Sequence, residues 1–483
     1  MPLGLLRLRL APDPAFGTRS QREVLGVSSL CSAILNSLPP NHSEVLILYR
    51  FIQAIFRHRS LLSLALFVTL IATYLSIGWK VRSRILEGNN DFIACYTAAR
   101  MVWDGKGAQL FDLREQTAYQ EAILHSLHTD FRFRDGLLAY IHAPFEIIWF
   151  IPLGGLGYLQ AYCVWLAVSL GCFVAGVYLL LCSQQSVTRG VLAKYILGSL
   201  AFFPVFINLL QGQDSAALFL FWTLGYWNVV RSKEATAGLW WSLLLQKFQV
   251  VLPTLLVLLM LKRWRVLTGF LTGSLALLVA SLAVVGFSGL ESYARLIVEV
   301  SGWIERKGIY PSQMHNLRAQ FYVWFYRDHP GVANLLTGLA SVVLLALLLR
   351  WWKGEWDPGG ARFGLKFSLL VTVSLLVSPH LNLHDLSCLL LPGLLIGQIS
   401  DQDAGTGSAF RRLRLGTWLV GYPLMLASLV VSGWLPIHLS VWGMIVIVLL
   451  LIQTLKQGRG APKWKAEPTA MSRECQASQE GCC

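Results

Sequence analysis

Residues 61–79 read LLSLALFVTLIATYLSIGW, and this stretch decides the fold class. It carries no charged residue, and its length is close to the roughly 20 apolar residues that a transmembrane helix requires. Three arginines precede it, at Arg50, Arg57 and Arg59. Because loops on the cytoplasmic side of membrane proteins are enriched in Lys and Arg, the stretch predicts a first span that starts in the cytoplasm.

The composition of the whole chain supports a membrane protein. Of its 483 residues, 55% are hydrophobic and only 14% are charged, and the mean hydropathy is +0.55. Soluble globular chains carry about 25% charged residues, so a soluble enzyme, a disordered scaffold and a fibrous protein are all excluded. The net charge of +14 fits the cytoplasmic bias of Lys and Arg in membrane proteins. No basic patch on a soluble face is present, so no nucleic-acid partner is expected.

Further apolar segments follow in close order and predict an all-α polytopic bundle of about 10–13 transmembrane helices. Several of the segments are shorter than a straight span needs, which indicates broken or re-entrant helices around a cavity. The segments lie at 145–156, 161–182, 191–210, 216–230, 237–245, 250–261, 266–287, 332–349, 363–377, 386–399, 415–431 and 441–455.

Charge predicts the side on which each connection lies. Residues 80–144 hold eight Lys or Arg and eight Asp or Glu, and this neutral balance suits a large first outer loop with short interfacial helices near 92–102 and 113–125. A second outer loop is expected at 287–330. The transmembrane domain then covers 60–455, between a cytoplasmic N-terminal tail at 1–59 and a cytoplasmic C-terminal tail at 456–483. Short basic connections mark the cytoplasmic side at 231–233, 262–265, 350–353 and 411–414.

Asp91 is the first candidate for catalysis, because it lies a dozen residues beyond the first span, beside apolar Phe92. A carboxylate there could take a proton from a substrate hydroxyl, or it could simply cap the helix that follows. Tyr96 and Arg100 are four residues apart on that helix and share a face. Arg100 could bind a phosphate in a bidentate manner, or it could pair with Asp104.

Polar residues also interrupt the next apolar segments. His142 precedes Glu146, a carboxylate just inside an apolar run, where unpaired charges are costly. Gln213 and Asp214 belong to the sequence Gln-Gly-Gln-Asp at 211–214, which could hydrogen-bond a sugar or could be a plain polar turn. If 237–261 were one helix, this turn would change sides; a break at Gln246–Gln249 keeps the polar motifs on one face.

Cationic and histidine candidates follow along the chain. Lys247 lies within an apolar stretch and could neutralise a lipid-linked phosphate or reach the interface. Arg318 lies in the second outer loop, and His380 and His384 lie between later spans. The two histidines and Asp385 resemble a metal half-site, but no further cluster has ligand spacing, and the nine cysteines form no C-x-x-C pair. We therefore expect no metal and no cofactor.

At these residues the sequence resembles glycosyltransferase family 87, a group of polytopic enzymes with the GT-C architecture. The resemblance covers roughly 61–455. It departs from the family at three places, where Ala143 replaces the first proline of Pro-Pro-Phe, Phe248 replaces the proline of Lys-Pro-Gln, and Cys95 replaces the first of two tyrosines. The motifs that carry it lie at 91–100, 105–112, 140–145, 152–153, 161–165, 212–214, 237–247 and 378–384.

The resemblance implies transfer of a hexose, often mannose, from a polyprenyl-phosphate donor to a glycan or glycolipid acceptor on the extracytoplasmic side of the cell membrane. It implies inversion at the anomeric carbon with Asp91 as general base. The expected donor-phosphate ligands are Arg100, Lys247, Arg318 and His380, and the expected substrate-binding residues are Tyr96, His142, Gln213, Asp214 and His384.

Two other functions remain open from the sequence. A polytopic secondary transporter or lipid flippase would share broken helices and a buried lysine, although no inverted repeat is visible and the neutral outer loop is long. A membrane protein that keeps this architecture without catalysis is the third reading.

Overall fold

The computed structural model describes residues 59–182, 188–326, 329–354, 356–398, 407–431 and 434–457. The chain divides into two compact units, residues 1–70 and 71–483, and the account below concerns the second. The two predicted cytoplasmic tails lie almost entirely outside the described residues.

The described residues are helical almost throughout, which confirms an all-α polytopic membrane protein. Within these residues the extended pairing is limited to one isolated bridge between Arg306 and Ile309. The principal helices are α3 (Arg59–Leu86), α4 (Phe92–Trp103), α5 (Leu113–Ser126), α6 (Tyr158–Cys182), α7 (Arg189–Leu200), α8 (Phe203–Gln211), α9 (Ser215–Val230), α10 (Glu234–Ser242), α11 (Phe248–Met260), α12 (Trp264–Ser301), α13 (Leu317–Phe321), α14 (Pro330–Trp352), α15 (Ala361–Val377), α16 (Leu390–Gln398), α17 (Gly407–Gly416), α18 (Tyr422–Val431) and α19 (Leu439–Gln457).

Six helical segments of the described chain are long and apolar enough to cross a membrane. A seventh is possible if α7 and α8, which meet at a bend of 67°, count as one broken span. The six segments are Leu64–Leu86, Tyr158–Cys182, Glu234–Met260, Trp264–Ser301, Pro330–Trp352 and Leu439–Gln457.

The number of full-length spans is thus smaller than the 10–13 that the sequence predicts, because several apolar segments form short or irregular helices. Residues 145–156, expected to be re-entrant or a short hairpin, form two short 3-10 helices, η2 (Pro144–Trp149) and η3 (Ile151–Gly155). The helix α9 and the segment Leu383–Gln398 are apolar but short. Between α17 and α18 lies a π-helical turn, Thr417–Gly421. The two short helices expected within residues 80–144 are present as α4 and α5.

The run from Glu234 to Met260 is interrupted in its middle, as the sequence predicts. A 3-10 segment, η4 (Leu243–Lys247), separates α10 from α11. The run still has the length and hydropathy of a single 27-residue span. The break matters because it places Lys247 at an irregular point of the backbone, where side chains from neighbouring turns can reach it.

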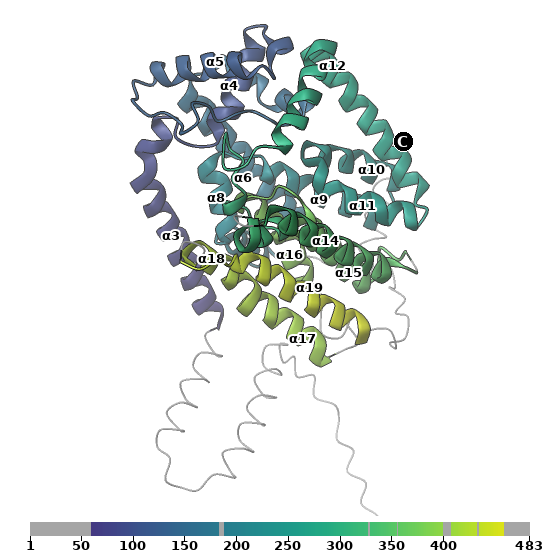
Figure 1. Cartoon of the computed structure of the whole chain (residues 1–483). Coiled ribbons are helices and arrows are strands. Elements are labelled where there is room, and N and C mark those ends of the chain that lie inside the picture. Colours follow the sequence, from purple (N-terminus) through teal and green to yellow (C-terminus); the bar gives the residue numbers. More distant parts are fainter. Residues whose placement is uncertain are drawn as a thin grey trace, which may run out of the picture. The chain divides into compact units, whose positions relative to one another are not determined.

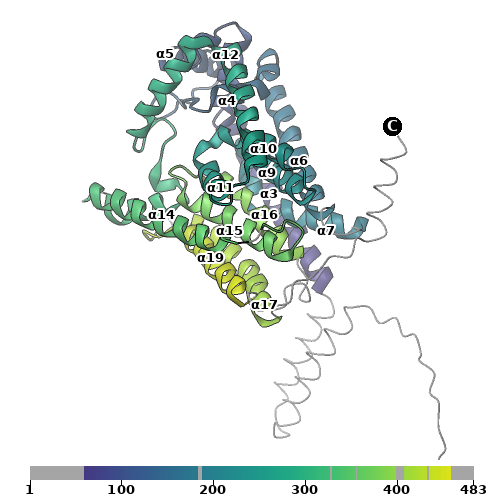
Figure 2. The same ribbon diagram turned by 90° about the vertical axis from the view of Figure 1, so that its right-hand side faces the viewer.

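Close backbone contact joins α10 to α12, and Figures 1 and 2 show the two helices side by side. A Cβ atom added at Gly238 would lie 2.0 Å from the Val266 carbonyl oxygen, and one added at Gly269 would lie 2.0 Å from the Ala235 carbonyl oxygen. Small residues at such crossings let membrane helices approach closely. Further along, α12 kinks at Gly286, whose φ of 67° favours glycine.

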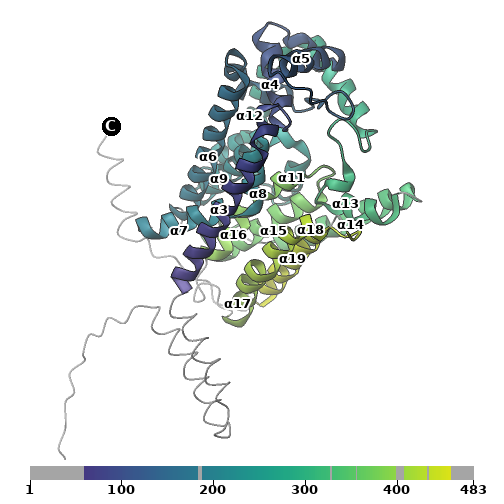
Figure 3. The ribbon, with the colours of Figure 1, turned by 90° about the vertical axis from the view of Figure 1, so that its left-hand side faces the viewer.

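Two buried apolar clusters fill the second unit. One joins α9, α10, α15, α16 and α19 around large side chains such as Trp222, Trp241 and Phe367. Figure 3 shows α15 and α18 beside α19 in this part. The other cluster joins α4 to the segment 137–165 and to the C-terminal half of α12. The polar residues described below lie on segments that contribute to one or the other cluster.

Substitution of Gly238 tests the α10–α12 contact. We expect Gly238→Ala to lower the unfolding free energy by about 1–3 kcal/mol, because overpacking forces the two backbones apart. The midpoint of thermal unfolding in detergent measures the effect. Gly338→Ala on α14 is the matched control, since a Cβ there meets nothing within 4 Å, and an equal loss in both variants would contradict the prediction.

Candidate active site

Turns from distant parts of the sequence bring the predicted polar residues together. The first precedes α4, the second leads into η2, the third joins α8 to α9, and the fourth joins α15 to the 3-10 helix η7 (Leu383–Leu389). Contacts between α8 and η7 and between α9 and η7 hold the third turn against the fourth. The break at η4 adds Lys247.

Asp91 is at the start of α4, but its side chain makes no capping hydrogen bond to this helix. Instead, Asp91 Oδ2 accepts a hydrogen bond of 2.8 Å from Gln213 Nε2. The carboxylate is half-buried. The capping alternative therefore does not describe the side chain, and two predicted site residues that are 122 positions apart are in direct contact.

Gly212 makes this contact possible. It ends α8 in the left-handed conformation, with φ 65° and ψ 38°, which glycine adopts at no steric cost. A Cβ atom at this position would lie 2.7 Å from Phe92 Cβ. The turn that carries Gln213 and Asp214 is consequently packed against the first turn of α4, next to Asp91.

Lys247 forms the centre of a buried ion cluster. Its Nζ lies 2.9 Å from Asp214 Oδ1, contacts Asp385 Oδ1 more closely, and lies 3.3 Å from Ser215 Oγ. Ser215 in turn donates to Asp385 Oδ1 at 2.7 Å. The lysine side chain is 10% exposed, and the two carboxylates are 2% and 1% exposed. Lys247 is therefore already neutralised within the protein and does not extend to the interface.

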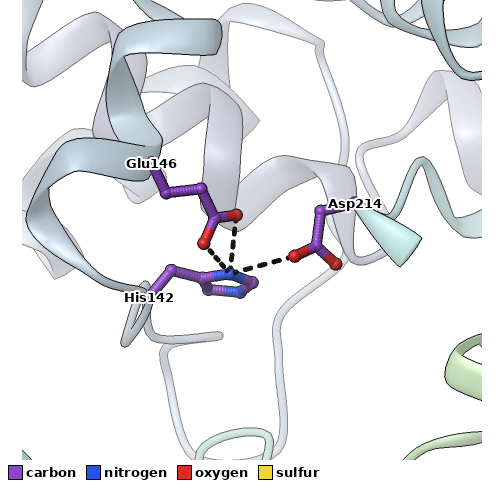
Figure 4. Close-up of side chains that lie close together, drawn as sticks. All are labelled: His142, Glu146 and Asp214. Atoms are coloured by element: carbon purple, nitrogen blue, oxygen red, sulfur yellow. Dashed lines mark hydrogen bonds and ion pairs between the residues drawn. The ribbon is translucent and has the colours of Figure 1, made fainter. Parts of the chain in front are cut away.

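His142, Glu146 and Asp214 form a second group next to the ion cluster, shown in Figure 4. His142 Nδ1 lies 2.9 and 3.0 Å from the two Glu146 oxygens and 3.8 Å from Asp214 Oδ2. Pro144 begins η2 between His142 and Glu146, where its fixed φ suits a helix start. The ring of Tyr140 stacks on the His142 ring with a centroid distance of 5.1 Å, which fixes its orientation.

Burial and neighbouring charges shift the proton affinities of this group. Burial raises the pKa of Glu146 to about 7, although His142 opposes the rise. Burial tends to lower the pKa of His142, but the charge of Glu146 and the hydrogen bond to it raise the pKa overall. Burial tends to raise the pKa of Asp214, but Lys247 and His142 hold it below its usual value.

The two later histidines line the same region. His384 Nδ1 is 3.0 Å from Gln211 Oε1, and His384 Nε2 is 3.6 Å from Asp385 Oδ1. Asp385 Oδ2 also accepts from the backbone of Asn382, as part of a capping box at the start of η7. Burial lowers the pKa of His380 to about 4, so this imidazole is neutral at pH 7 and cannot serve as a cation for a phosphate.

Arg318 approaches the site from another element. It belongs to the short helix α13, and its Nη1 donates to the Pro379 carbonyl oxygen at 3.4 Å. Asn316 Nδ2 binds the Ser378 carbonyl oxygen at 2.8 Å, which docks α13 on the loop that carries His380. Arg318 is half-buried, and it lies beside a predicted site histidine.

Two predicted site residues have other contacts. The Tyr96 hydroxyl donates to the Leu156 carbonyl oxygen at 2.6 Å, within a cluster of aromatic rings. Arg100 pairs with Asp104 at 3.1 Å on the surface and approaches the Gly154 carbonyl oxygen. Arg100 is nine residues beyond Asp91, or about 13 Å along a helix. Of the two roles that the sequence allows for Arg100, phosphate binding and pairing with Asp104, the structure shows the pair with Asp104.

The candidate site also contains residues that were not among the predicted ligands. Glu146, bonded to His142, and Asp385 are the principal ones. Ser215 donates to Asp385, and Gln211 bonds to His384. A signal for the carboxylates was available in the sequence, because an acidic residue beside an apolar run is costly unless it has a partner. Gln211 belongs to the polar motif at 211–214, whereas Ser215 carries no comparable signal.

Comparison with known proteins places this site in a family. Residues 140–379 match the model of glycosyltransferase family 87. The chain belongs to glycosyltransferase family 87. The protein is therefore a membrane glycosyltransferase, which favours this function over a transporter, a flippase or a catalytically inactive relative. No curated protein and no solved structure matches the chain.

The family 87 match covers about half of the chain, and its limits divide the site. His142, Glu146, Asp214, Lys247 and Arg318 lie inside the matched range. Asp91 precedes it, and the turn that contains His380, His384 and Asp385 follows it. The contacts described above join these outlying residues to the matched part of the fold.

Replacement of Lys247 tests the ion cluster. Lys247→Met leaves two carboxylates buried without their counter-charge, and breaking a buried pair in this way costs about 3–5 kcal/mol. We expect a lower midpoint of thermal unfolding in detergent, partly restored when Asp385→Asn is added. Lys106→Met is the control, because Lys106 forms an exposed pair with Glu115 at 3.8 Å. A Lys247→Met protein as stable as this control would refute the role of the cluster.

Proposed function

We propose that this family 87 protein transfers a hexose, mannose by resemblance, from a polyprenyl-phosphate donor to a glycan or glycolipid acceptor, with inversion and with Asp91 as general base. The observation that carries the proposal is the Asp91–Gln213 contact of 2.8 Å. It holds a half-buried carboxylate beside the buried ion cluster and leaves it uninvolved in helix capping.

The chemistry requires a single displacement at the anomeric carbon. The acceptor hydroxyl oxygen forms a bond to this carbon, the bond from the carbon to the phosphate oxygen breaks, and the polyprenyl phosphate leaves with the electron pair. Asp91 takes the hydroxyl proton, which makes the attacking oxygen more nucleophilic. Gln213 donates to one carboxylate oxygen and thereby orients the group. Because attack and departure occur on opposite faces of the sugar, the anomeric configuration inverts.

The negative charge of the leaving phosphate needs a cationic side chain nearby. The contacts that Lys247 and Arg318 already make decide which of the two is available for this role. Lys247 is already bound by Asp214 and Asp385, so we assign it the role of positioning these carboxylates. Arg318 makes one 3.4 Å hydrogen bond through Nη1 to the Pro379 carbonyl, and its guanidinium has further donors for a phosphate. Neutral His380, in the adjacent loop, can add a hydrogen bond.

Sugar recognition falls to the polar side chains around Asp91. Gln213, Asp214, His142 and His384 supply amide, carboxylate and imidazole groups that can bind sugar hydroxyls. Tyr96 and Arg100 are assigned structural roles within this proposal, because their hydrogen bonds go to the segment 154–156 and to Asp104. We place the site on the extracytoplasmic side of the membrane, in keeping with the neutral first outer loop.

The role of Asp91 is tested by Asp91→Asn. We expect transfer from polyprenyl-phosphate mannose to fall by about 10²–10⁴-fold, the usual contribution of a general base, while the thermal midpoint and donor binding persist. Mass spectrometry of the glycolipid product measures transfer. Asp104→Asn serves as the matched control, because Asp104 lies at the other end of α4 in a surface pair with Arg100. Unchanged turnover in Asp91→Asn rules out the base assignment.

The role of Arg318 is tested through the donor KM. A hydrogen bond to a charged group contributes about 1.5–3 kcal/mol, so we expect Arg318→Gln to raise the KM for the polyprenyl-phosphate sugar by about 10–100-fold. The KM for the acceptor should change little. Arg134→Gln, a variant in the first outer loop, is the control. A rise in the acceptor KM alone would assign Arg318 to the other substrate.

A further inference from the structure

The group formed by His142, Glu146 and Asp214 has a geometry that its role in sugar binding does not require. One donor atom from each residue lies within 4.8 Å of the other two. Figure 4 shows the carboxylates of Glu146 and Asp214 directed toward the same ring nitrogen of His142. The Glu146 oxygens lie 2.9 and 3.0 Å from His142 Nδ1. Ligand atoms about 3 Å apart are what a cation with bonds of about 2.1 Å needs in an octahedral shell.

Asp214 provides the second observation. Its Oδ1 pairs with the Lys247 ammonium at 2.9 Å, whereas its Oδ2 is buried without a hydrogen bond in the described part of the chain. Oδ2 is directed toward His142 Nδ1 at 3.8 Å. A buried carboxylate oxygen without a donor is costly, and a bound cation would satisfy it.

The charges of the buried cluster lead to the same conclusion. Glu146, Asp214 and Asp385 contribute three negative charges when ionised, and Lys247 contributes one positive charge. A cation requires a neutral His142 and ionised carboxylates as ligands, and in that state the sum is −2. Such an excess is costly where apolar helices surround the cluster, and a polyprenyl phosphate would add more negative charge. One divalent cation brings the sum to zero.

We propose that His142 Nδ1, Glu146 and Asp214 bind one divalent cation. One imidazole nitrogen and two carboxylates form a mixed ligand set suited to Mn²⁺ or Zn²⁺. Tyr140 orients the imidazole ring by stacking, and Lys247 orients Asp214 from its other oxygen. Partners of this kind, outside the ligand shell, are typical of protein metal sites.

Position suggests what the cation does. Asp214 directly follows Gln213, the residue that holds Asp91. A cation on Asp214 therefore lies close to the proposed base and could contact the donor phosphate through its remaining coordination positions. This last step rests on the proposed function, whereas the binding site itself does not.

Mn²⁺ is the probe that tests the site, and donor and acceptor are left out. The full chain is purified in detergent, treated with EDTA and titrated with MnCl₂, and bound Mn²⁺ is measured by electron paramagnetic resonance. We expect one bound Mn²⁺ per chain, with spin-echo modulation from a directly bonded nitrogen. Glu146→Gln should weaken binding at least tenfold, and His142→Gln should also remove the nitrogen signal. Glu115→Gln, which alters an exposed carboxylate, should bind Mn²⁺ like the unmodified protein.

Several results would overturn the proposal. These are no Mn²⁺ retained by the unmodified protein, an affinity of Glu146→Gln and His142→Gln equal to that of the unmodified protein, or a bound Mn²⁺ without nitrogen coordination. Size-exclusion profiles and thermal midpoints show whether the variants fold, and the nitrogen signal of the unmodified protein decides the matter if one does not. The failure of the site leaves the Asp91 prediction intact, because that prediction concerns transfer in a different variant.

Discussion

The contact of the Lys247 ammonium with Asp214 and Asp385 is the constraint on which the arrangement of the site depends. It joins η4, the α8–α9 turn and η7, three segments that do not adjoin in the sequence. Each of these segments departs from a regular membrane helix at that point. Irregular backbone is tolerated at membrane depth only where protein or a water-filled cavity surrounds it, and here the ion pairs join three such segments to one another.

From this centre the contacts lead outward to the proposed base. Gln213, directly before Asp214, binds Asp91. Gly212, one residue earlier, approaches Phe92 closely and thereby fixes the distance between the turn and α4. In the other direction Asp385 leads to His384 and Gln211, which returns to the same turn. The turn at 211–214 therefore connects the two apolar clusters of the fold.

Much of the fold could be predicted because it depends on local sequence. Hydropathy placed α6, α9, α14, α15 and α19 close to their observed bounds, and the polar residues at 246–249 indicated the break near Lys247. The number of full-length spans could not be predicted in the same way. Whether a short apolar segment such as 145–156 becomes a span or a 3-10 turn depends on the protein that packs around it, and that packing involves residues distant in sequence.

The site shows the same division. The sequence could indicate that Asp91, Lys247 and Glu146 needed partners, because charges beside apolar runs are costly. It could not indicate which partners they have. Lys247 was expected to meet a phosphate, yet its neighbours are Asp214 and Asp385, which are 33 and 138 residues away and have no spacing that relates them. Arg100 was expected at the donor, but the nearer Asp104 captures it at four residues' distance.

The cost of this cluster is itself an argument about function. Buried ion pairs rarely improve stability over apolar residues of similar volume, and a fold needing only stability could fill this space with leucine. The chain instead places three carboxylates, a lysine and three histidines around one turn. Such groups can hold a cation, orient sugar hydroxyls and move a proton, and a membrane glycosyltransferase needs at least two of these abilities. The energetic cost is thus understandable as a requirement of the chemistry that we propose at Asp91.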